Sequence, residues 1–214
     1  MRKVYRLPEI RVLDQEGRWD RNSEDEHLFW PRVTWLDPGT VSGVATVWFD
    51  PKAAFDGKIT AKVVLAYSEM FLYGPEYGLN GQANRFLRLR KSLDTEIGMA
   101  TGIESFVIRQ FNQSEEFLSP VRISAAVEFA LSRVRPGHNH EAAIGSIPVF
   151  KQSPSDAKNT FTNDRLKALR MFTPGPDHIN DAKRHCLLWI RKLPAAGMDF
   201  FISVHGYEEG WFEQ

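Results

Sequence analysis

The first regular pattern in the chain is a pair of apolar segments joined by a turn. Residues 34–37 (TWLD) end on an acidic residue, and residues 43–49 (GVATVWF) form a second apolar run after Pro38 and Gly39. A third apolar segment follows at residues 61–70. Short runs of this kind, bounded by Pro, Gly and Asp, predict β-strands. Because the connections are short, the three strands are predicted to lie side by side and antiparallel.

Helical and strand-like patterns alternate over the rest of the chain. Apolar residues at helical spacing predict a helix over residues 83–97. Ser119 before Pro120 predicts the start of a second helix, which runs to about residue 134. The remaining predicted elements are strands at residues 102–108 and 147–150, short helical segments opening at Ser153 and at Asn163 or Asp164, and a long helix over residues 177–193. This order predicts an α/β fold in which helices flank a mixed five-stranded sheet.

Composition narrows the possible partners and chemistry. The chain has 27 basic and 27 acidic residues, so no global charge indicates a polyanionic partner and any nucleic-acid surface must be a local patch. Cys186 is the one cysteine in the sequence, which excludes an intramolecular disulfide and a cysteine-rich zinc site.

The charge pattern also divides the chain. Residues 1–31 are rich in charge and are predicted to form an extended arm, residues 32–195 a single folded domain, and residues 196–214 a C-terminal tail. The sequence contains no apolar run of membrane-spanning length and no signal-peptide core near residue 1. We therefore expect a cytoplasmic protein that does not bind a membrane.

Three acidic residues occupy unusual places in this pattern. Asp37 ends the first strand, Glu104 interrupts the fourth, and Asp181 lies beside the apolar stripe of the last helix. If the two strands are neighbours and the helix packs over their ends, the three carboxylates converge. Hard oxygen ligands favour Mg²⁺ or Mn²⁺, and such a cluster can hold two cations about 4 Å apart. His178 lies three residues before Asp181 on the same side of the helix.

Each of these residues also has a purely structural interpretation. Asp37 precedes Pro-Gly, where Asp is favoured in turns. Glu104 would be satisfied on an edge strand or beside an arginine, and Asp181 in the first helical turns favours the helix dipole. Asp177 is interpreted as the N-cap of the last helix. His185, one turn beyond Asp181, lies either behind the acidic residues or on the surface.

Four segments in order resemble the motifs of a known family. They are LDPGTVSGVATVWF at 36–49, IESF at 103–106, QSPSDAKNTFT at 152–162 and DHINDAKRHCLLWI at 177–190. The chain resembles the RuvC-like branch of the ribonuclease H-like superfamily, in particular the RuvC-like Holliday junction resolvases carried by bacteriophages. The resemblance spans roughly residues 33–193 and implies that residues 32–195 form a ribonuclease H-like nuclease domain.

The resemblance implies roles for individual residues. The metal ligands of the family fall on Asp37, Glu104 and Asp181. The fourth position falls on His178, where many members have Asp, and Asp177 is the alternative. Lys158 matches the family lysine that approaches the scissile phosphate and balances charge in the transition state.

The implied function is metal-dependent, structure-specific cleavage of DNA at Holliday junctions by a homodimer, with two Mg²⁺ or Mn²⁺ ions and no nucleotide cofactor. Branched DNA is the expected partner. Alternatives are a nuclease of the same fold acting on flaps, forks or RNA–DNA hybrids, and a non-catalytic DNA-binding or assembly protein. An ATPase of the actin and sugar-kinase type is disfavoured because the chain lacks a second phosphate loop.

Two groups of basic residues are candidates for contact with the DNA backbone, although each is equally well explained as a solvated face. The first comprises Arg85, Arg88, Arg90 and Lys91, and the second comprises Lys158, Arg165, Lys167 and Arg170.

Overall fold

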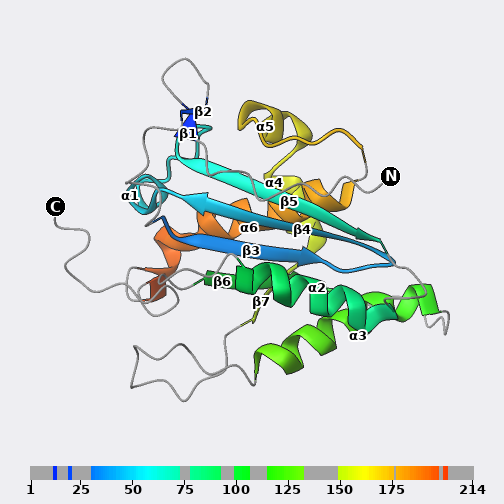
Figure 1. Cartoon of the computed structure of the whole chain (residues 1–214). Coiled ribbons are helices and arrows are strands. Elements are labelled where there is room, and N and C mark those ends of the chain that lie inside the picture. Colours follow the sequence, from blue (N-terminus) through cyan, green and yellow to red (C-terminus); the bar gives the residue numbers. More distant parts are fainter. Residues whose placement is uncertain are drawn as a thin grey trace.

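A mixed five-stranded sheet forms the centre of the molecule (Figure 1). The computed structural model describes residues 12–13, 19–20, 30–72, 78–92, 99–106, 115–132, 149–175, 177–197 and 200–201. The strand order is β5-β4-β3-β6-β7. The strands are β3 (Arg32–Asp37), β4 (Val41–Phe49), β5 (Val64–Leu72), β6 (Met99–Glu104) and β7 (Val149–Gln152). A separate two-stranded ladder pairs β1 (Val12–Leu13) with β2 (Trp19–Asp20).

The strand directions follow from the lengths of the connections. β3 and β4 pair antiparallel across a tight turn, and β4 and β5 pair antiparallel across the segment that contains α1. After longer crossovers β6 pairs parallel with β3, and β7 pairs parallel with β6. Leu36 of β3 is the partner of Ile103 of β6. Asp37 and Glu104 each follow that pair by one residue, so both end their strands at the same edge of the sheet.

Helices cover both faces of the sheet and divide the core in two. The long helix α6 (Asp177–Ala196) lies on one face, and α2 (Gly78–Ser92) and α3 (Glu115–Leu131) lie on the other (Figure 1). Successive residues along a strand point to opposite faces of the sheet and so contribute to the two cores in turn. Val33, Trp35 and Ala45 pack toward α6, while Leu36 and Val44 pack toward α2 and α3.

Three shorter helices complete the α6 side. They are α1 (Pro51–Phe55), α4 (Pro154–Thr160) and α5 (Asn163–Ala168). Asp50 caps α1 by accepting hydrogen bonds from the N–H groups of Lys52 and Ala53, and Thr162 caps α5 through Arg165 N–H. The residues of α6 from 180 to 190 are all buried, because α4 lies against its outer side while the sheet covers the other.

Several predicted boundaries are wrong. Ser119 does not start a helix, because α3 already begins at Glu115; Ser119 is buried and Pro120 lies inside the helix. α2 begins five residues before the predicted start at residue 83, and the predicted end of that helix lies outside the described residues. β6 begins at Met99 and ends at Glu104, earlier than the predicted 102–108. β7 ends two residues later than predicted, and β5 begins three residues later.

The ends of the chain are described only in part. Phe200 and Phe201 follow α6, and Phe201 is fully buried in contact with the rings of Phe49 and Phe55. The remaining residues of the predicted tail and most of the predicted arm lie outside the described residues, and the predicted domain boundaries stay predictions. None of the described helices has the length and apolar character needed to cross a membrane.

Candidate active site

A close approach of α6 to β4 builds the site. A Cβ atom on Gly43 would lie 2.2 Å from the main-chain oxygen of His178, so only glycine lets the first turn of α6 rest directly on the strand. Gly43 is also the cross-strand partner of Asp37. The glycine therefore brings the start of α6 to the end of β3.

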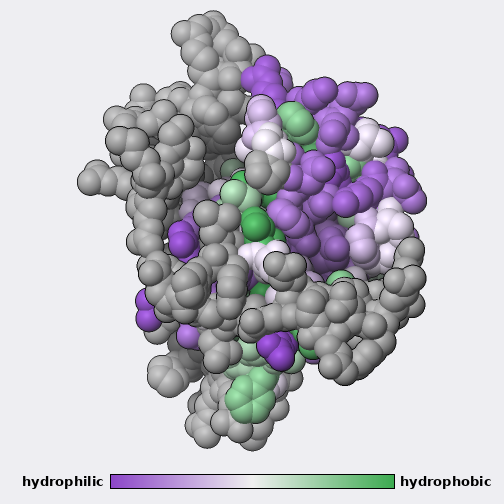
Figure 2. All heavy atoms as spheres, turned by 90° about the vertical axis from the view of Figure 1, so that its right-hand side faces the viewer, coloured by the Kyte–Doolittle hydropathy of each residue, from purple (hydrophilic) through white to green (hydrophobic). Residues whose placement is uncertain are grey.

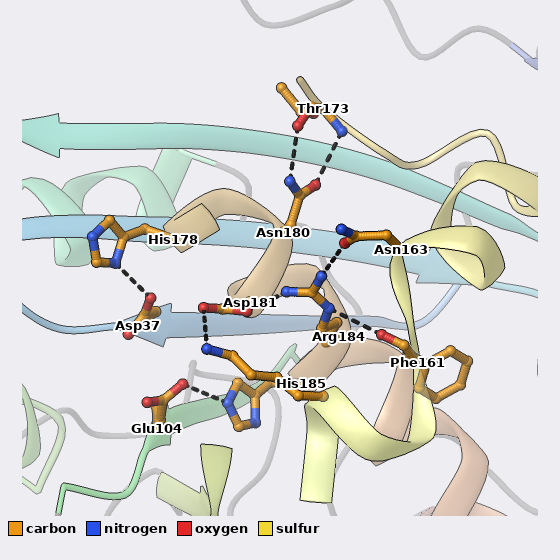
Figure 3. A network of polar contacts seen from close by, with 11 residues as sticks. Asp37, Glu104, Phe161, Asn163, Thr173, His178, Asn180, Asp181, Arg184 and His185 are labelled. Atoms are coloured by element: carbon orange, nitrogen blue, oxygen red, sulfur yellow. Dashed lines mark hydrogen bonds and ion pairs between the residues drawn. The ribbon is translucent and has the colours of Figure 1, made fainter. Parts of the chain in front are cut away.

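Asp37, Glu104 and Asp181 come together at this edge from β3, β6 and α6 (Figure 3). Asp37 and Asp181 are each 6% exposed, and Glu104 is half-buried. Burial raises the pKa of Asp37 to about 6; the hydrogen bond with His178 opposes the shift, and the charges of Glu104 and Asp181 add to it. The three carboxylates thus lie close enough for their charges to interact.

Each carboxylate has its own donor. His178 Nδ1 lies 2.9 Å from Asp37 Oδ2, and His185 Nε2 lies 2.8 Å from Glu104 Oε2. Asp181 has two basic partners: Lys158 Nζ lies 3.0 Å from Oδ2, and Arg184 Nη1 donates to Oδ1. Basic side chains therefore compensate part of the negative charge.

The acidic residues also raise the pKa values of two basic residues. The hydrogen bond with Asp37 raises the pKa of His178 against the opposing effect of burial. For Lys158, burial lowers the pKa, but the hydrogen bond and charge of Asp181 outweigh it, so that the pKa is raised. The acidic residues beside them thus favour the charged forms of His178 and Lys158.

The chemistry of the donor set fits a hard divalent cation. Asp37, Glu104 and Asp181 present carboxylate oxygens whose charges repel one another, and a cation between them would relieve that repulsion. Within the described residues, no three side chains of His, Cys, Asp or Glu are grouped closely enough to hold a metal ion in the conformation seen. Metal binding would accordingly require the carboxylates to come closer together around the ion than they lie in this conformation.

The two alternatives for the fourth ligand position differ in surroundings. His178 contacts Asp37, whereas Asp177 is exposed in the first turn of α6. An N-cap residue precedes the first residue of a helix, but Asp177 is itself the first residue of α6. The interpretation of Asp177 as the N-cap is therefore wrong.

Two further residues of α6 contact the carboxylates; the sequence left the position of His185 open between two alternatives and did not indicate Arg184. His185 is fully buried and contacts Glu104, so the surface alternative for it is wrong. Arg184 is also buried; besides Asp181 it donates to Phe161 O at 2.9 Å and to Asn163 Oδ1. A basic residue on an amphipathic helix normally indicates a solvated face, and the sequence carries no signal that the chain at Phe161 and Asn163 covers this one.

The predicted basic face of α2 is partly neutralised. Arg85 forms an ion pair with Glu69, and Arg90 is buried with Nε 3.0 Å from Thr101 Oγ1, so Arg90 does not belong to an outer face. Arg88 is exposed. The side chain of Lys91 lies outside the described part of the structure.

The second basic group is more exposed, and one of its members, Lys158, lies at the carboxylates. Lys158 contacts Asp181 directly, and Arg165 and Lys167 are exposed on α5. Lys167 also pairs with Asp164 at 3.5 Å. Figure 2, which faces the edge where β3 ends, shows hydrophilic side chains gathered over the side of the sheet that α6, α4 and α5 cover.

Comparison with known proteins identifies the fold. No protein-family model and no curated protein matches the sequence. A solved structure of T. thermophilus RuvC in complex with a Holliday junction substrate aligns with 75% of this chain and 94% of that chain, with a TM-score of 0.51 and 16% identity. A second Thermus thermophilus RuvC structure aligns with 81% of this chain and 98% of that chain, with a TM-score of 0.49 and 17% identity. The chain therefore has the RuvC-like, ribonuclease H-like fold predicted from its sequence.

Proposed function

We propose that this chain is a metal-dependent, structure-specific DNA endonuclease that resolves four-way (Holliday) junctions. The observation that carries the proposal is the interaction of three buried or half-buried carboxylates, Asp37, Glu104 and Asp181, at one edge of the sheet. Like charges held together cost folding free energy, and acidic groups with perturbed pKa values cluster at functional sites. The likeness in fold to a protein solved with a Holliday junction substrate supports the choice of substrate.

In this proposal Asp37, Glu104 and Asp181 hold two Mg²⁺ or Mn²⁺ ions, with His178 at the fourth position. Bound divalent cations supply the activation of water and the stabilisation of the leaving oxygen in phosphodiester hydrolysis. The chain supplies the orientation of the ligands. His178 holds one oxygen of Asp37, and Arg184 holds one oxygen of Asp181.

Lys158 has the properties of a phosphate-binding residue. Its side chain is 53% exposed although its Nζ lies 3.0 Å from Asp181. A flexible ammonium group at the border between the acidic cluster and solvent can turn from the carboxylate to a DNA phosphate and balance charge there. Arg165 and Lys167 on α5 would extend this contact along the backbone, while Arg85 is less suited because it already pairs with Glu69.

The proposal is tested by cleavage of defined DNA substrates. The wild-type chain is expected to nick a four-way junction in the presence of Mg²⁺ and not a linear duplex of the same sequence. Asp37→Asn should fold and bind the junction, with cleavage reduced by at least about 10³-fold. The matched control is Asp56→Asn, which changes an exposed carboxylate outside the site and should cleave like the wild type.

Other outcomes identify the rival functions. Preferred cleavage of a flap, a fork or an RNA–DNA hybrid would indicate a nuclease of the same fold with another substrate. Binding of the junction without any cleavage, in Mg²⁺ and in Mn²⁺, would indicate a non-catalytic DNA-binding protein. Full activity of Asp37→Asn would overturn the proposed site.

A further inference from the structure

His185 has both a stacking partner and a hydrogen-bond partner at each ring nitrogen. It is fully buried, although it is a polar residue in the middle of α6. Its ring lies parallel to that of Trp35 at an interplanar angle of 8°, with 5.4 Å between the centroids. Trp35 can take this position because Gly102, its partner on β6, has no side chain; a Cβ there would lie 2.2 Å from the Trp35 ring.

Both ring nitrogens of His185 contact strand-end side chains. Nε2 lies 2.8 Å from Glu104 Oε2, and Nδ1 lies 3.0 Å from Gln152 Oε1. Glu104 and Gln152 are cross-strand partners and are the last residues of β6 and β7. The imidazole therefore joins the ends of two parallel strands to α6.

The direction of the contact with Glu104 follows from the chemistry of the groups. A carboxylate can only accept a hydrogen bond, so Nε2 must carry the hydrogen and donate it. This holds whichever end of the Gln152 amide faces Nδ1, because the amide can either accept from that nitrogen or donate to it. His185 thus directs one donor to Glu104 from a ring whose orientation is fixed.

Glu104 needs such a partner because its side chain is long and half-buried. A free glutamate has several rotamers, and ordering one for a ligand costs free energy at the moment of binding. With Oε2 held by His185, the rotamer is already selected and Oε1 is left for another partner. Figure 3 shows the Glu104 side chain beside His185, on the same side of the network as Asp181 and Asp37.

We propose that His185 is a positioning residue that holds Glu104 in the orientation needed to bind a divalent cation, with Trp35 and Gln152 fixing the ring. This inference rests on the proposed function, because it takes Glu104 as a metal ligand. Groups that orient metal ligands in this way typically change metal affinity by about 10- to 100-fold when they are removed.

The test measures Mn²⁺ binding to the full chain without DNA, by calorimetry, beside thermal unfolding. His185→Phe keeps a ring against Trp35 but removes both hydrogen bonds, and it should weaken Mn²⁺ binding by about 10- to 100-fold. His185→Gln places an amide nitrogen where Nε2 was and should recover most of that loss. Cys186→Ala is the matched control: it alters a fully buried neighbour on α6 whose Sγ contacts main-chain oxygens, and it should leave Mn²⁺ affinity unchanged.

A double mutant separates positioning from a general effect on the fold. In a Glu104→Gln background the proposed ligand is already removed, so His185→Phe should cause no further loss of Mn²⁺ affinity. An equal loss in both backgrounds would show that His185 does not act through Glu104 and would overturn the inference. If His185→Phe fails to fold, Gln152→Met, which removes only the support of Nδ1, should still weaken binding by about tenfold.

The remaining outcomes are distinguishable. Wild-type Mn²⁺ binding that His185→Phe or Gln152→Met leaves unchanged overturns the positioning role and leaves the proposed function standing. No Mn²⁺ binding by the wild-type chain overturns the proposed metal-dependent function and the positioning role together.

Discussion

Asp37 illustrates the conflict between stability and chemistry at a single residue. It is buried at the end of a strand, and burial together with the charges of Glu104 and Asp181 raises its pKa to about 6 from the ordinary 3.8. Because its pKa is higher in the folded state than in the unfolded state, the protonated form stabilises the fold. That contribution is complete below about pH 3.8 and is lost as the pH rises through about 6.

Replacing Asp37 by Asn should therefore stabilise the chain at neutral pH. Without divalent cations, Asp37→Asn is expected to raise the free energy of unfolding at pH 7.5 by on the order of 2 kcal/mol, because Asn keeps an acceptor for His178 but carries no charge. The difference should shrink toward zero at pH 4. Thermal unfolding in a chelator across this range measures it, with Asp56→Asn as the exposed control. Equal melting temperatures of Asp37→Asn and wild type at pH 7.5 would contradict the expectation.

Sequence reasoning named the acidic residues together with His178 and Lys158, but it left Arg184 out and left the position of His185 open. Asp37 and Glu104 interrupt apolar strands, where a carboxylate needs an explanation, so their positions alone draw attention. Arg184 and His185 lie on a helix, where charged residues usually face solvent. Arg184 is buried where Phe161 and Asn163 lie against α6, and His185 is buried against the ends of β6 and β7. The local pattern contains neither of these long-range contacts.

At the scale of elements, the site depends on how closely α6 approaches β4. His178 and Asp181 lie in the first two turns of the helix, and the position of those turns is set where Gly43 meets the His178 main chain. A displacement of the helix would move both side chains away from Asp37. The contact between the helix and the strand is thus part of the site although Gly43 has no functional group.

Gly43→Ala tests this dependence. The added methyl group would meet main-chain atoms, which cannot move aside as a flexible side chain can, so the start of α6 must shift. We expect a loss of stability of about 1–3 kcal/mol and loss of both Mn²⁺ binding and cleavage. Gly57→Ala is the control. It adds a methyl group at a positive φ of 73° with open space around it, and it should lower stability without altering cation binding. Wild-type Mn²⁺ affinity in Gly43→Ala would show that the site tolerates the shift.

The existence of the elements could be predicted more reliably than their ends. Apolar spacing indicates that a strand or a helix is present, but it does not indicate where α3 starts. Ser119 and Pro120 have the composition of a helix start, but the chain already turns helical at Glu115, at the cost of one main-chain hydrogen bond that Pro120 cannot donate. Burial of Ser119 shows that tertiary packing outweighs the local preference.

For the whole molecule, the fold class followed from the order of elements. Short connections made β3, β4 and β5 neighbours, and right-handed crossovers leave few arrangements for the strands that follow. The two layers of helices then follow from the need to cover both faces of the sheet. Which helices cover which face could not be derived from the order alone.

The proposed reaction also makes a prediction about assembly. A four-way junction is resolved by two symmetric nicks. The described residues of one chain supply one set of carboxylates, so two chains related by a two-fold axis would have to act together. Sedimentation of the full chain with a four-way junction should therefore show two chains per junction. A single bound chain that still makes both nicks would contradict the homodimer.

The buried thiol of Cys186 has a practical consequence. Its Sγ lies 3.5 Å from Val33 O and 3.4 Å from Ala45 O, between α6 and the two strands, and burial raises its pKa. The thiolate is the form of cysteine that attacks an alkylating reagent, so burial and the raised pKa both protect this sulfur from alkylation. Labelling must wait until the helix lifts from the sheet, which is also the motion that separates Asp181 from Asp37. The rate of alkylation of Cys186 thus measures how often the edge that carries Asp37 and Asp181 opens, without any probe having to be introduced.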